Sequence, residues 1–224
     1  MFQYMQEIRA LIEKEIRLEW RQKYALNGML LYIVSTVFVC YMSFKLKVDI
    51  IEPITWNTLF WIILLFTAVN SITKSFTQEG AGRQLYYYTL ASPQGIIISK
   101  IIYNTLLMLV LSVLGFVVYV VMMGNPVGNL PLYLVCILLG SIGFSTTLTM
   151  VAGIASKAEN TSTLMAILSF PIILPMLMMI TKLSKSAMDG LGWETSYDEI
   201  AILLAIDAIV LSISYLLFPY LWRS

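Results

Sequence analysis

The sequence lacks histidine altogether and holds only two cysteines among its 224 residues. Cys40 and Cys136 are far apart, and each lies within an apolar stretch. A histidine-based metal site, a Ser-His-Asp or Cys-His catalytic centre, haem ligation by histidine and a Cys-x-x-Cys motif are therefore excluded. We predict no catalytic residue, no metal site and no cofactor bound by this chain. Any haem or metal on which it works belongs to another chain.

Charge is scarce as well. Charged residues make up 12% of the chain and hydrophobic residues 59%, against about 25% and 45–50% in an average soluble domain. The formal net charge of +1 provides no attraction for a polyanion, so no nucleic-acid partner is expected. The sequence also has no Gly-x-x-x-x-Gly-Lys-Ser/Thr phosphate loop, so the chain is not expected to hydrolyse ATP itself.

Long apolar runs are abundant instead. A membrane-spanning helix needs about 20 apolar residues, and six runs meet this requirement: 25–44, 54–73, 101–123, 132–153, 161–180 and 200–221. Only Asp207 among the charged residues lies within them. Since backbone polar groups must be satisfied internally in lipid, these runs are predicted to be helices. The fold class is therefore an all-α integral membrane protein, with residues 1–224 forming one domain.

The distribution of lysine and arginine predicts the orientation of the chain. If the N-terminus is cytoplasmic, ten of these residues fall in cytoplasmic segments and four, Lys45, Lys47, Lys182 and Lys185, fall in outer loops. Positive residues concentrate on the cytoplasmic side of membrane proteins. We therefore expect both termini in the cytoplasm.

Residues 1–24 precede the first span and are predicted to form an amphipathic helix lying on the membrane. At about 100° per residue, one side carries Met5, Ile8, Leu11, Ile12, Ile16 and Leu18, and the other carries Gln3, Gln6, Glu7, Glu13, Lys14, Arg17 and Arg21. Glu15 and Glu19 interrupt the apolar side. The alternative is a solvated helix that merely precedes the first span.

The cytoplasmic segment 74–100 joins the second and third spans. Its residues 83–90 have room for about two helical turns, and residues 92–95 (Ser-Pro-Gln-Gly) are predicted to turn the chain into the third span. Tyr86, Tyr87 and Tyr88 have amphipathic rings that suit the membrane interface. The alternative is that they fill a groove on a partner protein.

Three features lie within the spans. Pro171 and Pro175 are predicted to kink or break the fifth span, as a static device or as a hinge. In the fourth span small residues recur at helical spacing and predict a helix-packing face: Gly140, Ser141, Gly143, Ser145, Thr149, Ala152 and Ser156. Asp207 is a candidate functional residue by default, but we favour a structural role, bonded to a hydroxyl or reached by Lys182 or Lys185.

Several of these features together resemble the CcmB family of membrane permeases from the ABC-type cytochrome c maturation complex, also called the haem exporter. The resemblance covers essentially the whole chain. It includes the six spans, the N-terminal helix ending in Leu-Glu-Trp-Arg with Glu19, Trp20 and Arg21, the proline pair of the fifth span, and the segment 76–93 with Glu79 and the Ser-Pro at its end. Arg83 departs from the family pattern, where glycine is frequent.

The resemblance implies an ABC exporter permease in the bacterial inner membrane. Two copies would bind two ATP-hydrolysing subunits, CcmA, which hold ATP and Mg²⁺, and haem would be handled by CcmC with CcmD and by the periplasmic chaperone CcmE. The ATPase would dock on a surface formed by Glu79, Arg83, Tyr86, Tyr87, Tyr88 and Pro93. Trp193 and Tyr197, before the sixth span, could face a periplasmic partner.

Two other functions remain open. A permease of another ABC exporter, moving a lipid, a drug or a polysaccharide precursor, would share the six spans and the cytoplasmic segment. A membrane scaffold that transports nothing would form no stable complex with an ATPase. An intramembrane enzyme is less consistent with the sequence, because its polar residues do not cluster within the spans.

Overall fold

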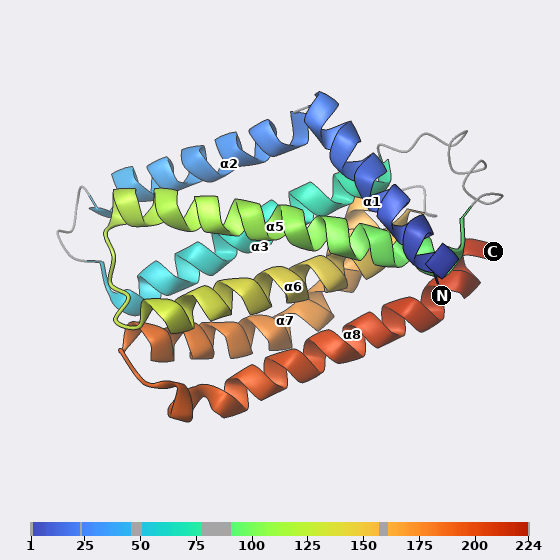
Figure 1. The fold of residues 1–224 in the computed structure, drawn as a ribbon. Coiled ribbons are helices and arrows are strands. Elements are labelled where there is room, and N and C mark those ends of the chain that lie inside the picture. Colours follow the sequence, from blue (N-terminus) through green and yellow to red (C-terminus); the bar gives the residue numbers. More distant parts are fainter. Residues whose placement is uncertain (1, 23, 46–50, 78–90, 157–160, 224) are drawn as a thin grey trace.

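The computed structural model describes residues 2–22, 24–45, 51–77, 91–156 and 161–223 (Figure 1). Six helices in this part of the chain are long and apolar enough to cross a membrane: α2 (Tyr24–Cys40), α3 (Pro53–Thr77), α5 (Pro93–Met123), α6 (Leu130–Ala155), α7 (Thr161–Met188) and α8 (Tyr197–Arg223). Short helical turns, η1 (Tyr41–Lys45) and η2 (Trp193–Ser196), follow α2 and precede α8. The prediction of an all-α membrane protein with six spans is confirmed.

The first helix, α1 (Phe2–Gln22), is not a span but lies obliquely across one end of the bundle, against α5 (Figure 1). The end of α8 lies at this same end. We call it the near end, and the opposite end, where α5 leads into α6 and α7 into α8, the far end. The near end also contains the beginnings of α5 and α7 and the last turns of α3 and α6.

Helix α6 lies at the centre of the bundle and packs against α3, α5, α7 and α8. Six of the seven predicted small residues, from Gly140 to Ala152, are buried and allow the close approach expected of such a face. Ser156 is half-buried and follows the helix as its C-cap. The buried face also bonds to α5: the Ser141 hydroxyl donates to Ser112 Oγ at 3.1 Å, and the Asn104 amide donates to Thr149 Oγ1 at 2.9 Å. The predicted packing face is therefore confirmed for these residues, with the exception of Ser156.

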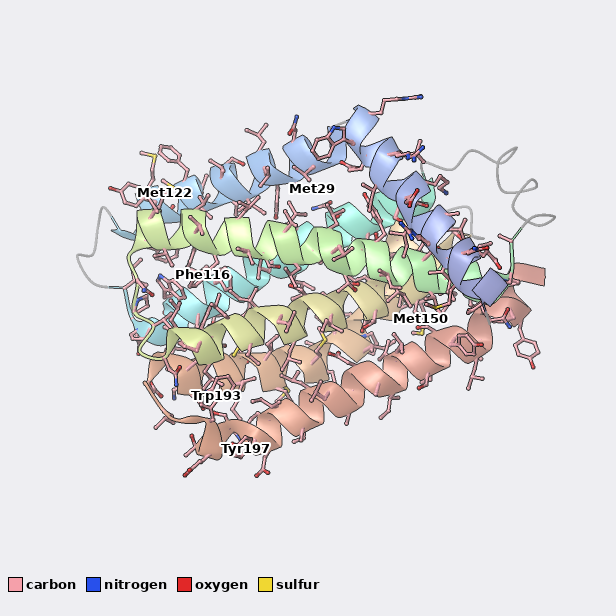
Figure 2. The ribbon with its side chains drawn as sticks, viewed as in Figure 1. Met29, Phe116, Met122, Met150, Trp193 and Tyr197 are labelled. Carbon is pink, nitrogen blue, oxygen red and sulfur yellow. The ribbon has the colours of Figure 1, made fainter. Side chains whose placement is uncertain are left out.

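Aromatic rings fill the core of the far end. Trp56, Phe60 and Trp61 of α3 meet Phe116 and Tyr119 of α5 and Tyr133 and Phe144 of α6, with ring centroids 4.7–6.3 Å apart. Figure 2 shows Phe116 between α5 and α6. Tilted and edge-on pairs at these distances are individually favourable and hold one another in place. The far end is therefore tightly packed.

A buried asparagine joins three helices beside these rings. The Asn57 amide donates to Ser184 Oγ of α7 at 2.8 Å, and its oxygen accepts from the Tyr133 hydroxyl of α6 at 3.2 Å. Trp61 Nε1 donates to the same Ser184 oxygen at 2.9 Å. Since unsatisfied polar groups are expensive inside a membrane protein, these bonds together fix the register of α3 against α6 and α7.

Two local expectations need correction. Helix α5 begins at Pro93, eight residues before the predicted span, because Ser92 caps the helix and Pro93 occupies its first turn. Residues 93–95 therefore belong to the helix and do not form a turn before it. Helix α7 runs without interruption through Pro171 and Pro175, so the chain does not break there. A kink at these prolines remains a prediction, and both prolines are exposed on the outside of the bundle.

The central packing can be tested at Gly140 of α6. A Cβ at this position would lie 2.7 Å from Trp61 Cζ3 and closer still to Ile180 Cδ1. Because the Trp61 ring is held by Ser184 and by neighbouring rings, Gly140→Ala should destabilise the protein by about 1–3 kcal/mol, the usual effect of overpacking. The measurement is thermal unfolding in detergent, followed by intrinsic fluorescence.

Gly28→Ala in α2 is the matched control, since nothing lies within 4 Å of a Cβ there. Alanine should leave the melting temperature unchanged or raise it slightly. Equal melting temperatures for the two variants would contradict the packing of α3, α6 and α7 described above.

Candidate functional site

Three glutamates of α1 point toward the near end of the bundle. Glu7, Glu15 and Glu19 are separated by eight and four residues, so they lie on one face of the helix. Each forms hydrogen bonds with a residue outside α1. Helix α1 is therefore joined to the bundle by hydrogen bonds of its carboxylates as well as by apolar contacts.

Glu7 closes the beginning of α5. Its Oε1 atom accepts from the Ser92 backbone N–H at 2.6 Å and from the Ser92 hydroxyl at 2.9 Å, while Ser92 Oγ accepts the Gly95 N–H at 3.1 Å. A carboxylate is favoured here by the partial positive charge of the helix N-terminus. A Cβ at Gly95 would lie 2.7 Å from Glu7 Oε1, so glycine is what allows α1 to approach this closely.

Glu15 neutralises a buried lysine. Lys100 of α5 is only 2% exposed, and its ammonium donates to Glu15 Oε1 at 3.3 Å and to the Ser75 carbonyl of α3 at 2.8 Å. Lys14 lies 2.9 Å from the same carboxylate oxygen. A buried charge is tolerated only when it is paired and hydrogen-bonded. Lys100 therefore ties α1, α3 and α5 together.

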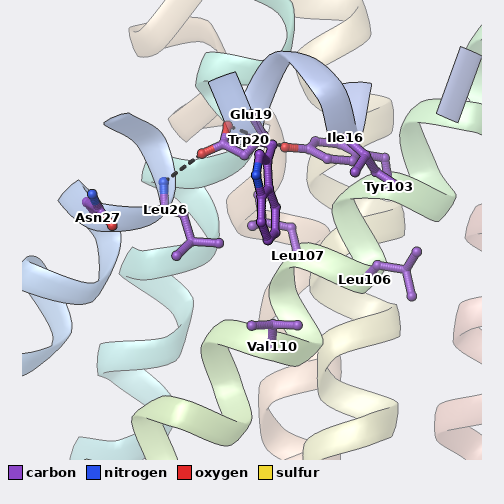
Figure 3. A pocket seen from close by; sticks show the side chains of 9 residues that line it. All are labelled: Ile16, Glu19, Trp20, Leu26, Asn27, Tyr103, Leu106, Leu107 and Val110. Atoms are coloured by element: carbon purple, nitrogen blue, oxygen red, sulfur yellow. Dashed lines mark hydrogen bonds between the residues drawn. The ribbon is translucent and has the colours of Figure 1, made fainter. Parts of the chain in front are cut away.

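Glu19 joins α1 to the beginning of the first span. Its Oε1 atom accepts the Leu26 N–H of α2 at 2.8 Å, and its Oε2 atom accepts the Tyr103 hydroxyl of α5 at 3.5 Å (Figure 3). The first N–H groups of a helix have no partner within it, so Glu19 acts as a cap for α2. With Glu7 and Glu15, it holds α1 along a little more than three turns of helix.

These contacts change how α1 is understood. Ile8, Leu11, Ile12 and Leu18, from the predicted apolar side, are half-buried at the bundle, whereas Met5 and Ile16 are exposed. Trp20 is exposed as well, at 77%, as is Arg21. Glu15 and Glu19 are anchors to α2 and α5, not defects in an apolar face. Helix α1 thus has a face toward the protein, an exposed apolar edge and an exposed charged side.

The predicted docking surface is only partly within the described residues. Glu79, Arg83, Tyr86, Tyr87 and Tyr88 lie outside them. Pro93 is described, and it begins α5 directly after Ser92, the residue that Glu7 binds. The C-terminal end of the predicted docking segment therefore coincides with the contact between Glu7 and Ser92 that joins α1 to α5.

The predicted periplasmic surface lies at the far end. Trp193 of η2 and Tyr197 of α8 are both exposed at the link between α7 and α8 (Figure 2). Beside them the Lys182 ammonium of α7 is 2.7 Å from Glu199 Oε1 of α8. This ion pair joins the two helices across the link.

Asp207 has a different environment from the one expected. It is 7% exposed, and its Oδ2 atom has no hydrogen-bond partner among the described residues. Its Oδ1 atom lies over Gly143 of α6, 2.7 Å from where a Cβ would be. Lys182, predicted to reach Asp207, pairs with Glu199 instead. The expected bond to a hydroxyl, to Lys182 or to Lys185 is therefore absent from the part of the chain described.

A family model described as CcmB protein matches residues 6–221, nearly the whole chain. No curated protein matches the chain at a significant level.

The ion pair between Glu15 and Lys100 predicts that loss of the Glu15 charge would loosen α1 from the bundle. Glu15→Gln removes the carboxylate that neutralises a buried ammonium, which typically costs about 3–5 kcal/mol. We expect a lower melting temperature in detergent and faster tryptic cleavage after Arg9 and Arg17, because α1 would detach from α5. Limited proteolysis followed by mass spectrometry measures this.

Glu13→Gln is the control on the same helix. Glu13 is about half exposed and pairs with Arg9 and Arg17 on the surface, at 3.3 and 3.6 Å, where ion pairs contribute about 0–1 kcal/mol. Its cleavage rate and melting temperature should match the unmodified protein. Equal cleavage of both variants would contradict the anchoring role of Glu15.

Asp207→Asn should be tolerated. The amide has the shape of the carboxyl group without its charge, and no charged partner of Asp207 is found among the described residues. We expect an unchanged melting temperature and largely normal cytochrome c maturation in cells that depend on the variant. Loss of holo-cytochrome with a folded, inserted chain would show that Asp207 has a functional role that the amide cannot fill.

Proposed function

The chain belongs to the CcmB family, and from this membership we propose how it couples a partner's ATP hydrolysis to movement in the membrane. Membership makes it a multi-pass membrane subunit of the ABC-type cytochrome c maturation (haem exporter) system, working with other Ccm components. As a permease subunit it is not itself an ATPase. We propose which surface binds the ATP-hydrolysing subunit and which helices move when that subunit changes conformation.

We place the near end in the cytoplasm of a bacterium, with the chain in its inner membrane. Ten of fourteen basic residues would then be cytoplasmic, in accord with the positive-inside rule. This orientation also puts the predicted docking segment on the side where ATP is available. The ATP-hydrolysing subunit CcmA, holding ATP and Mg²⁺, would dock on residues 76–93 of each of two copies of this chain.

The contact that supports this proposal most strongly is the one between Glu7 and Ser92. The docking segment ends at Ser92 and Pro93, and Glu7 binds Ser92 through both its N–H and its hydroxyl. A displacement of the docking segment would therefore be transmitted to α1 and α5 together. Because Glu15 and Glu19 hold α1 to Lys100 and Tyr103 further along α5, α1 and the near half of α5 would move as one piece.

The far end would remain comparatively fixed. Its aromatic rings and the Asn57 network join α3, α5, α6 and α7, and such packed contacts do not deform gradually. Docked ATPases bias the membrane helices only if their contacts differ between two states. We propose that the near end changes between these states while the far end presents Trp193 and Tyr197 toward the periplasm.

In this scheme the chain transmits motion and does not hold haem. Haem would be bound by CcmC, with CcmD, and by the periplasmic chaperone CcmE, whose haem-loaded form is released as ATP is hydrolysed. The absence of histidine from the sequence supports this division, since histidine is the usual protein ligand of haem iron.

The docking surface can be tested by replacing Tyr86, Tyr87 and Tyr88 with alanine. We expect the variant to insert normally but to lose most of the co-purifying ATP-binding subunit, because three interfacial rings are typical anchors of a protein interface. The tagged chain would be purified in mild detergent from its native membrane, and its partners quantified by mass spectrometry.

Tyr220→Ala is the control, since Tyr220 is an exposed tyrosine of α8 near the same end. It should retain the ATP-binding subunit. Full recovery of the ATPase with the triple variant would refute the docking surface. Recovery of an ATPase without any haem-handling membrane protein from the unmodified chain would favour a permease of another exporter, and recovery of neither would favour a scaffold.

A further inference from the structure

Three polar atoms inside the near half of the bundle have no hydrogen-bond partner in the part of the chain that is described. They are Ser71 Oγ and Ser75 Oγ of α3 and Asn104 Oδ1 of α5. Asn104 is completely buried, and Ser71 is 4% exposed. Because burying a polar atom without a partner is costly, these three atoms need an explanation.

The antiparallel packing of α3 and α5 brings the three atoms to one place (Figure 1). At the near end, the Lys100 ammonium of α5 donates to the Ser75 carbonyl of α3 at 2.8 Å. Toward the far end the residue numbers rise along α5 and fall along α3. One helical turn in that direction leads to Asn104 on α5 and to Ser71 on α3. These two residues therefore lie opposite each other, one turn deeper than the Lys100–Ser75 contact.

Two further hydrogen bonds fix this arrangement. At the far end of the same interface the Tyr119 hydroxyl donates to the Trp56 carbonyl at 2.9 Å, which is the same register of α3 against α5. On its other side, the Asn104 amide nitrogen donates to Thr149 Oγ1 of α6 at 2.9 Å. The amide is therefore held at the junction of α3, α5 and α6, with its oxygen left to another partner.

The chemistry of the surrounding groups limits what that partner can be. The Lys100 ammonium is one turn away, and its charge repels a metal cation. The Asn104 oxygen accepts hydrogen bonds and has no hydrogen to donate, so it disfavours an anion, whereas serine hydroxyls both donate and accept. The ligand must therefore donate to the amide oxygen and accept from hydroxyls. Water does both, and a buried water typically makes about three hydrogen bonds.

We propose that Ser71, Ser75 and Asn104 form a binding site for a buried water molecule between α3 and α5. The water accepts from the two serine hydroxyls and donates to Asn104 Oδ1. It fills the near half of an interface whose far half is closed by aromatic rings. Because a water can exchange its partners, α3 and α5 can shift against each other more easily here than at the rings. The site itself does not depend on the proposed ATPase coupling.

X-ray footprinting of the full chain in nanodiscs detects such a water. Radiolysis converts a bound water into a hydroxyl radical where it lies, and the radical oxidises neighbouring side chains, methionine among them. Met108 is fully buried one turn beyond Asn104, and long helical side chains lean toward the preceding turn. We expect mass spectrometry to show Met108 oxidised several-fold faster than Met29 of α2, which is similarly buried.

Variants of the site connect the oxidation to its residues. Asn104→Leu keeps the approximate shape of the side chain without its polar atoms, and Ser71→Val replaces the hydroxyl by methyl groups. Each should slow Met108 oxidation to the rate of Met29. Ser112→Ala is the matched control, one turn from Met108 on the other side, because its hydroxyl already has a partner in α6; it should leave the Met108 rate unchanged. Slow oxidation of Met29 shows that each variant remains folded.

Two footprinting results would overturn the proposal. If Met108 is oxidised as slowly as Met29 in the unmodified chain, no water is bound beside it. If rapid Met108 oxidation persists in both Asn104→Leu and Ser71→Val, the water is held by other residues.

The melting temperature of Ser71→Ala gives an independent measurement with a predicted sign. If the hydroxyl is bonded to water, its removal should lower the melting temperature, whereas removal of a hydroxyl that has no partner should raise it. Alanine also favours a helix more than serine does, which acts against the predicted decrease. An unchanged or raised melting temperature would contradict the water site.

Discussion

The structure depends first on the burial of the Lys100 ammonium. A lysine with 2% of its surface exposed is stable within an apolar bundle only if its charge is neutralised and its donors are bonded. Glu15 of α1 supplies the charge, and the Ser75 carbonyl of α3 supplies an acceptor. Because of this requirement α1, which is not a membrane span, is held against the spans α3 and α5. Helix α1 is therefore an integral part of the fold.

The two ends of the bundle are held together by different kinds of contact. At the far end, interlocked aromatic rings and the bonds of Asn57 favour one arrangement. At the near end, α1 is joined to α2 and α5 by a small number of carboxylate contacts, which can be made or lost one by one. Such an asymmetry fits the proposed function, in which a partner's motion enters on one side of the membrane. Here the polar contacts lie beside the segment through which we propose that the motion enters.

Local features of the chain were predictable from the sequence, and contacts between distant residues were not. The six spans and the packing stripe of α6 follow from run length and spacing alone. Glu15 and Glu19 interrupt the apolar side of a helical wheel, and the wheel does not show that Lys100 lies opposite, 85 residues further along the chain from Glu15. Asn57 likewise bonds to Ser184 across 127 residues. Lys182 and Lys185 are the basic partners predicted for Asp207, but Lys182 pairs with Glu199. The start of α5 at Pro93 is predictable from the sequence, since a serine followed by proline is a common helix beginning.

The most direct test of the central claim is the number of haem-chaperone molecules released for each ATP hydrolysed, measured on the complex reconstituted with Glu15→Gln. If α1 and the near half of α5 must move as one piece, hydrolysis should continue while this ratio falls well below that of the unmodified complex and of the Glu13→Gln complex. An unchanged ratio, in a variant whose α1 has demonstrably detached from α5, would contradict the account.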